Sequence, residues 1–224
     1  MHNPKFDTAL SYYRDASDSW TRSHLVEELL DNLPAHDITA WANSTAGRES
    51  TMGAILLGDL ADRAGDECTA HRHYTDAAQR GDFYGYVSLA AIENDKANLS
   101  EAIDFTRKAA ELGDWESMIC IGGYLKDQGH QDQAQAWWEK AAAVGVSKGM
   151  IYLGLMAEER QRVDEAIGWF RKAADAGNVL GMNILGNLLS ENGETIEARL
   201  WYRKAAGLGD QNALENLNAF DQVG

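Results

Sequence analysis

Hydrophobic and polar positions follow a helical period along most of the chain. The segment from Trp169 to Gly177, Trp-Phe-Arg-Lys-Ala-Ala-Asp-Ala-Gly, is representative: apolar residues recur three and four positions apart, and a glycine follows. This spacing is typical of a helix with one buried face, and glycine suits the residue just after a helix end. The pattern predicts a helix that ends shortly before Gly177.

Close copies of this segment recur along the chain at one fixed interval. They end 32 residues apart, at Gly81, Gly113, Gly145, Gly177 and Gly209. A fixed period in this range marks one supersecondary unit that is copied several times. We therefore expect an all-α solenoid of helix-turn-helix units. Its five repeats would occupy residues 50–81, 82–113, 114–145, 146–177 and 178–209, together 50–209.

Each repeat begins with a helix in which small residues keep a constant register, as at Gly149 and Gly154. Glycine inside a helix costs about 1 kcal/mol relative to alanine, so its recurrence predicts that a neighbouring helix approaches closely there. Residues after the terminal glycines, such as Asp82, are suited to cap the next helix. The turns inside the repeats carry glycine at alternate copies, Gly65, Gly129 and Gly193, which fits a left-handed residue after a helix.

The two ends of the chain depart from the period. Residues 1–49 are helical in pattern, with Pro34 ending one helix and Asp37 suited to cap the next. Residues 210–224 repeat only a first helix. Terminal units of a solenoid must cover an open face, so we interpret 1–49 as an N-terminal helical capping region and 210–224 as a C-terminal capping helix. A separate N-terminal domain is the alternative.

The last full repeat carries a resemblance to a known family. Leu185-Gly186 in its first helix is followed by Ala198, Trp201-Tyr202 and Lys204-Ala205-Ala206, with Gly209 at the end. In these residues the chain resembles the Sel-one-like repeat family, a relative of the tetratricopeptide repeats. The resemblance implies a right-handed superhelix whose first helices line the concave face. It also implies an adaptor that binds proteins and has no chemistry of its own. The turn inside each pair is shorter than the family's.

The charge balance limits the kinds of partner. The formal net charge is −15, from 35 acidic and 20 basic residues. Nucleic-acid binding requires Lys and Arg to neutralise phosphates, so it is disfavoured, whereas a basic or mixed basic and apolar protein or peptide fits. The alternative is that acidity serves only solubility. Without a signal-peptide pattern or a membrane-length apolar run, we expect a cytoplasmic protein that does not bind membranes.

A candidate binding surface lies on the first helices. A row of mostly aliphatic residues falls opposite their small residues, at Ile55, Val87, Ile119, Ile151 and Asn183. Acidic residues follow near the helix ends, where the helix dipole does not favour them. We expect an apolar floor with an acidic border, although the row could instead pack between neighbouring helices. The predicted partner-binding residues are Tyr84, Asp95, Trp115, Ile119, Asp127, Ile151, Glu158, Glu159 and Glu191.

Three functions follow from this sequence. We expect a non-enzymatic scaffold that binds a protein or peptide on its concave face. A more specific alternative is an immunity-type protein that neutralises a basic toxin or nuclease, which the acidic charge suggests. The third is a hydrolase that uses the region of Cys68 and His71. No motif for a nucleophile or phosphate-binding loop is present, and His71 and His73 do not share a helix face. We therefore expect no catalytic residue, metal or cofactor.

Overall fold

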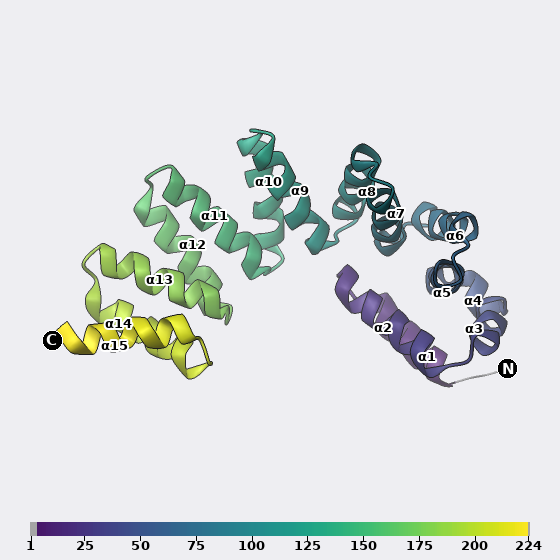
Figure 1. Cartoon of the computed structure of the whole chain (residues 1–224), viewed down its shortest axis with the longest axis horizontal. Helices are drawn as coiled ribbons and strands as arrows, with labels where there is room; N and C mark the ends of the chain where they lie inside the picture. Colours follow the sequence, from purple (N-terminus) through teal and green to yellow (C-terminus); the bar gives the residue numbers. More distant parts are fainter. Residues whose placement is uncertain (1–3, 224) are drawn as a thin grey trace. The chain divides into compact units, whose positions relative to one another are not determined.

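The computed structural model describes residues 4–223, with side chains to residue 219, and every element in that range is a helix (Figure 1). The chain forms two compact units, residues 1–121 and 122–224. The boundary falls inside α9 (Trp115–Asp127). Unit 1 contains α1 (Pro4–Asp15), α2 (Ser19–Asn32), α3 (Ala35–Ala42), α4 (Thr45–Glu49), α5 (Thr51–Arg63), α6 (Glu67–Gln79), α7 (Phe83–Asp95) and α8 (Leu99–Glu111). Unit 2 contains α10 (Gln131–Ala143), α11 (Ser147–Glu159), α12 (Val163–Asp175), α13 (Val179–Glu191), α14 (Thr195–Gly207) and α15 (Gln211–Val223).

Consecutive helices pack in pairs, which confirms the all-α solenoid of helix-turn-helix units. Within the units, α5 packs on α6, α7 on α8, α11 on α12 and α13 on α14. The division into capping regions and five repeats stays a prediction, and residues 1–3 and 224 of those regions lie outside the described residues.

The turn inside each pair contains one left-handed residue. Gly65, Gly129 and Gly193 have φ of 74°, 82° and 85°. The intervening pairs place Ala97 and Gln161 at the same register, with φ of 59° and 57°. A side chain is unfavourable in this conformation, so these two turns retain the geometry despite their residue type.

The recurring helical glycines allow close helix contacts, as predicted. A Cβ on Gly154 would lie 2.6 Å from Cε1 of Phe170, and one on Gly149 would lie 2.8 Å from the Trp138 carbonyl oxygen. Any larger residue would force the second helix away from the first. These positions therefore fix the spacing of paired and successive helices.

The residues after the terminal glycines cap the following helices, which confirms the prediction for Asp82 and Asp114. The Tyr84 amide donates to Asp82 Oδ1 over 3.0 Å, and the Ser117 amide donates to Asp114 Oδ2 over 2.9 Å. The prediction for Asp37 is wrong. Pro34 occupies the N-cap position of α3, and Asp37 lies in the first turn, where its carboxylate still faces the positive end of the helix dipole.

The first two helices form an antiparallel pair, the N-terminal hairpin (residues 4–32), which packs against first helices of the repeats. Helix α2 contacts both α5 and α7, and Figure 1 shows it beside them. Val26 is fully buried and Leu29 nearly so. The hairpin thus covers the parts of α5 and α7 that it contacts.

Two N-cap aspartates hold the hairpin by hydrogen bonds. The Tyr13 hydroxyl donates to Asp82 Oδ2 over 3.0 Å, and the Arg22 guanidinium pairs with Oδ1 of the same carboxylate. The Ser19 amide donates to Asp114 Oδ1 over 2.7 Å. Both aspartates are buried, with 3% and 0% exposure. One carboxylate in each case therefore caps a repeat helix and anchors the hairpin.

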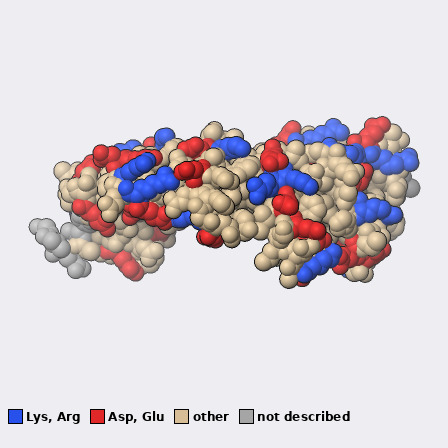
Figure 2. All heavy atoms as spheres, turned by 90° about the horizontal axis from the view of Figure 1, so that it is seen from above, with Lys and Arg blue, Asp and Glu red and all other residues tan. Residues whose placement is uncertain are grey.

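Acidic and basic side chains are interleaved over the face seen in Figure 2. Several form exposed ion pairs, such as Arg63 with Asp31 at 2.9 Å and Lys126 with Glu159 at 2.6 Å. Such pairs contribute little to stability, but they partly neutralise the charge of the acids that they engage.

Candidate functional site

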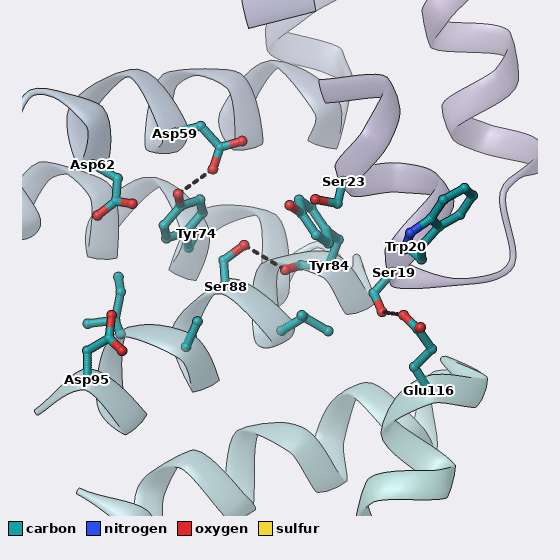
Figure 3. Close-up of a pocket in the computed structure, with 13 residues that line it drawn as sticks. Ser19, Trp20, Ser23, Asp59, Asp62, Tyr74, Tyr84, Ser88, Asp95 and Glu116 are labelled. Carbon is teal, nitrogen blue, oxygen red and sulfur yellow. Dashed lines mark hydrogen bonds between the residues drawn. The ribbon is translucent and has the colours of Figure 1, made fainter. Parts of the chain in front are cut away.

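The N-terminal hairpin closes one side of a pocket in unit 1 (Figure 3), here called the acidic pocket. Its volume is about 420 Å³. Helix α2 forms one wall, α5, α6 and α7 form the others, and the first turn of α9 contributes one residue. The lining residues are Ser19, Trp20, Ser23, Asp59, Asp62, Tyr74, Tyr84, Val87, Ser88, Ala91, Ile92, Asp95 and Glu116.

All the charged residues that line the acidic pocket are acidic. Four lining residues are carboxylates, Asp59, Asp62, Asp95 and Glu116, and none is Lys or Arg. The nearby Arg63 is paired with Asp31. Carboxylates from three helices around one cavity produce a negative potential that the low-dielectric walls strengthen.

Asp59 is the most deeply placed of these carboxylates. It accepts a hydrogen bond from the Tyr74 hydroxyl (Figure 3). Burial raises the pKa of Asp59 to about 6, although the Tyr74 hydrogen bond opposes the shift. Burial and the charge of Asp59 also raise the pKa of Tyr74, so its phenol stays protonated and keeps donating. A cation entering the pocket would favour the ionised form of Asp59.

Aromatic and hydroxyl groups of α2 and α7 complete the wall. Trp20 is 65% exposed and stacks on His24 with ring centroids 5.6 Å apart. The Ser88 hydroxyl donates to the Tyr84 carbonyl oxygen over 3.0 Å, and the Ser19 hydroxyl donates to Glu116 Oε2 over 2.7 Å. In Figure 3, Trp20 stands at the edge of the pocket and the Tyr84 ring lies beside Ser23. The pocket thus combines carboxylates, hydroxyls and aromatic faces.

The structure brings only part of the predicted site together in this pocket. Tyr84 and Asp95 line it, from opposite ends of α7. Trp115 and Ile119 lie half-buried on α9 and are not lining residues. Two of the nine predicted partner-binding residues therefore line the acidic pocket, and Val87 of the aliphatic row lines it as well.

In unit 2, the predicted acids are exposed at the ends of first helices: Asp127, Glu158, Glu159 and Glu191. Glu159 pairs with Lys126, which reduces the local charge. Ile151 does not form an exposed floor, because it is only 6% exposed and belongs to the core of unit 2. Ile55 and Asn183 are buried as well. For these three positions the row packs inside the helix layers, as the alternative interpretation held.

Four residues that make the pocket acidic and aromatic were not among those predicted from the sequence: Asp59, Glu116, Trp20 and Tyr74. Comparison of the repeats could have identified Asp59, because it is the only charged residue at its position in the five predicted repeats. The equivalent positions in the other repeats are uncharged: Ala91, Gly123, Leu155 and Asn187. Trp20 belongs to the hairpin, where no repeat register applies, so only its docked position reveals its role.

Other kinds of site find no support among the described residues. Among the side chains of residues 4–219, no group of three or more His, Cys, Asp or Glu residues is placed to hold a metal ion. Cys68, considered above for a hydrolase, is an exposed thiol on α6. None of the described helices combines the length and apolar character required to cross a bilayer.

Two solved Sel1-type structures share the fold of this chain. One is a Sel1 repeat protein from Oxalobacter formigenes, with 18% identity, a TM-score of 0.64 and coverage of 96% of this chain and 87% of the other. The second is a protective antigen of uropathogenic Escherichia coli strains that displays an SLR fold, with 20% identity and a TM-score of 0.63. It aligns over 95% of this chain and 55% of its own.

A third solved structure is YrrB, a TPR protein described as having an unusual peptide-binding site. It has 16% identity and a TM-score of 0.50, with coverage of 82% of this chain and 98% of its own. At these identities the likeness concerns the fold alone. No curated protein matches the chain by sequence.

A family model establishes the relationship. The Sel1 repeat model matches residues 84–114, 122–146, 147–178 and 180–210, which together make up more than half of the 224 residues. Sel1 and TPR-like repeats generally mediate protein–protein interactions and are generally non-enzymatic scaffolds. The chain belongs to the Sel1 repeat family.

Proposed function

We propose that this protein is an adaptor that binds a basic protein or peptide, and that the acidic pocket receives a Lys or Arg side chain of that partner. One observation carries the proposal: four carboxylates line a single cavity that no Lys or Arg lines. An uncompensated group of carboxylates attracts a cation during encounter and orients it once bound.

The dimensions of the pocket favour an extended segment over a helix. A volume of about 420 Å³ is near the lower end of small-ligand sites, and a helix is roughly 10 Å across. The pocket can therefore hold one or two long side chains while the rest of the partner lies outside. The exposed face of Trp20 would contact the aliphatic stem or the charged head of such a side chain, an interaction worth about 0.5–2 kcal/mol.

The proposal is tested with fluorescein-labelled peptides of identical length that carry Lys, Arg or norleucine at two central positions. Fluorescence anisotropy at low and at moderate salt measures their affinity for the whole chain. We expect the Lys and Arg peptides to bind and the norleucine peptide to bind at least about tenfold more weakly.

Substitutions locate the binding site. Asp62→Asn combined with Asp95→Asn removes two exposed carboxylates of the pocket without touching a buried group, and should weaken the Lys peptide several-fold. Asp104→Asn, an exposed acid on α8 outside the pocket, is the matched control and should leave affinity unchanged. Equal binding of the three peptides, or equal losses in both variants, would contradict the pocket as the site.

A further inference from the structure

Helix α14 presents an apolar stripe to solvent. Ile196 is 83% exposed and Leu200, one turn later, is 51% exposed. Arg203 lies on the same face of the helix, one turn after Leu200, and Arg199 and Lys204 flank this face on either side. These five residues are called the α14 patch.

The fold does not require aliphatic residues at these positions. The opposite face of α14 carries its buried residues, Ala198, Trp201, Tyr202 and Ala205. Comparison with the other repeats leads to the same conclusion. The positions 32 residues apart that are equivalent to Ile196 and Leu200 hold polar or small residues. Ile196 corresponds to Cys68, Ser100, Asp132 and Asp164, and Leu200 corresponds to Arg72, Asp104, Ala136 and Gly168.

The charge of α14 is also reversed relative to the other second helices. In α6, α8, α10 and α12, acids outnumber Lys and Arg by one, whereas α14 carries three basic residues and the single acid Glu197. Glu197 is itself occupied, because Arg171 pairs with it and the Trp201 indole donates to it over 3.1 Å. In a chain of net charge −15, the α14 patch is therefore locally basic.

A recess borders the exposed aliphatic residues. Leu200, Trp201, Arg203, Lys204 and Glu197 line a cavity of about 410 Å³. The Lys204 ammonium lies 3.9 Å from the centroid of the Trp201 ring, so the lysine covers one side of the indole. An aliphatic side chain placed in this recess would contact Leu200 while its neighbours reach the basic flanks.

We propose that the α14 patch docks an acidic amphipathic helix of a partner protein. Ile196 and Leu200 are aligned along the α14 axis, and a partner helix with aliphatic residues three and four apart would match that line. Acidic residues beside those anchors would meet the exposed Arg203 and Lys204. A second copy of the same patch fits poorly, because a two-fold contact would place these basic residues against one another.

This surface extends the proposed function and does not depend on it, because the partner has the opposite charge to the one expected at the acidic pocket. An adaptor with both surfaces would select two different proteins by the sign of their charge. The two proposals therefore fail or succeed separately.

The probe is a synthetic 18-residue helical peptide with Leu at positions three and four apart and Glu and Ala elsewhere. A peptide with the same composition in scrambled order and a peptide with Lys in place of Glu are the controls. Anisotropy titrations use the full chain at 50 mM and 300 mM salt. We expect the acidic helix to bind, the scrambled and Lys peptides to bind at least about tenfold more weakly, and higher salt to reduce affinity.

The residues at equivalent positions in other repeats show which substitutions the fold accepts. Ile196→Asp with Leu200→Ala introduces the residues found at Asp132 and Ala136, and should weaken the acidic helix at least about tenfold without changing the thermal midpoint. Val144→Asp, at a residue 66% exposed outside the patch, should have no effect on binding. An unchanged affinity in the double variant, or binding that ignores peptide charge, would overturn the proposal. So would a homodimer in sedimentation experiments that the double variant abolishes, because the occupant would then be a second copy.

Discussion

Replacing Asp114 by Ala tests whether the N-cap aspartates hold the N-terminal hairpin in place. Asp114 is fully buried, caps α9 through the Ser117 amide at 2.9 Å and receives the Ser19 amide at 2.7 Å. Loss of the cap costs about 1 kcal/mol. Loss of the charged acceptor leaves the buried Ser19 amide without its partner, which costs about 1–3 kcal/mol more. We expect the free energy of unfolding to fall by about 2–4 kcal/mol.

Urea unfolding followed by circular dichroism measures this loss, and hydrogen exchange locates it. In Asp114→Ala, the amides of α2 should exchange faster together with those at the start of α9. Asp66→Ala is the matched control, because Asp66 also caps a helix, through the Thr69 amide at 3.1 Å, but is exposed and belongs to the cap of α6. Its effect should be clearly smaller and confined to α6. Equal shifts of the urea midpoint, or unchanged exchange in α2, would refute the anchoring role.

Three further predictions concern packing, backbone conformation and pH. Gly122→Ala should destabilise the protein, because its Cβ would lie 2.2 Å from Trp138 Nε1, whereas Gly123→Ala, with open space at that position, should stabilise it by about 0.5–1 kcal/mol in thermal unfolding. Ala97→Gly should raise the thermal midpoint, because it relieves a left-handed alanine at φ 59° and is worth up to about 1 kcal/mol. The pKa of Asp59 is raised from 3.8 to about 6 by burial, so the folded state retains a proton that the unfolded state releases. The unfolding free energy should therefore fall as pH rises through about 4 to 6, by roughly 1–3 kcal/mol, and Asp59→Asn should remove that fall in urea titrations at several pH values.

Each of these has a definite contrary result. Similar stability of the two glycine variants would show that the Trp138 contact does not fix the helix spacing. A lower midpoint for Ala97→Gly would mean that the alanine carries no strain there. An identical pH dependence for the Asp59→Asn variant and the unchanged protein would show that Asp59 does not titrate in this window.

The repeating part of the fold could be predicted because its determinants are local. Glycines such as Gly81 and Gly113 end helices, and the aspartates that follow cap the next ones, all within a few residues. The burial of the aliphatic row was harder to predict. A helical wheel assigns Ile151 to a face but does not say whether the next helix covers that face, and in the structure its core position leaves it 6% exposed.

The candidate site could be predicted only in part, because one of its walls is helix α2, which lies far from the repeat helices in the sequence. Tyr84 and Asp95 lie on one repeat helix and were accessible to reasoning from the period. Trp20 and Ser19 reach the pocket only through docking of the hairpin, whose contacts with Asp114 span 95 residues of sequence. No local pattern encodes that distance. The second role of Asp82 and Asp114, which bind the hairpin as well as capping a helix, could not be predicted either. A capping aspartate has the same sequence signature whether or not it accepts a second hydrogen bond.

The docking of the hairpin changes how the first repeats should unfold. In a simple repeat array, each unit contacts only its neighbours, and stability resembles a one-dimensional chain of coupled segments that fray from the ends. Here α2 contacts α5 and α7, and Ser19 reaches the cap of α9. The hairpin thus couples three successive layers directly. Unit 1 is expected to melt as one cooperative block, while the last helices of unit 2, which lack such a connection among the described residues, open one layer at a time.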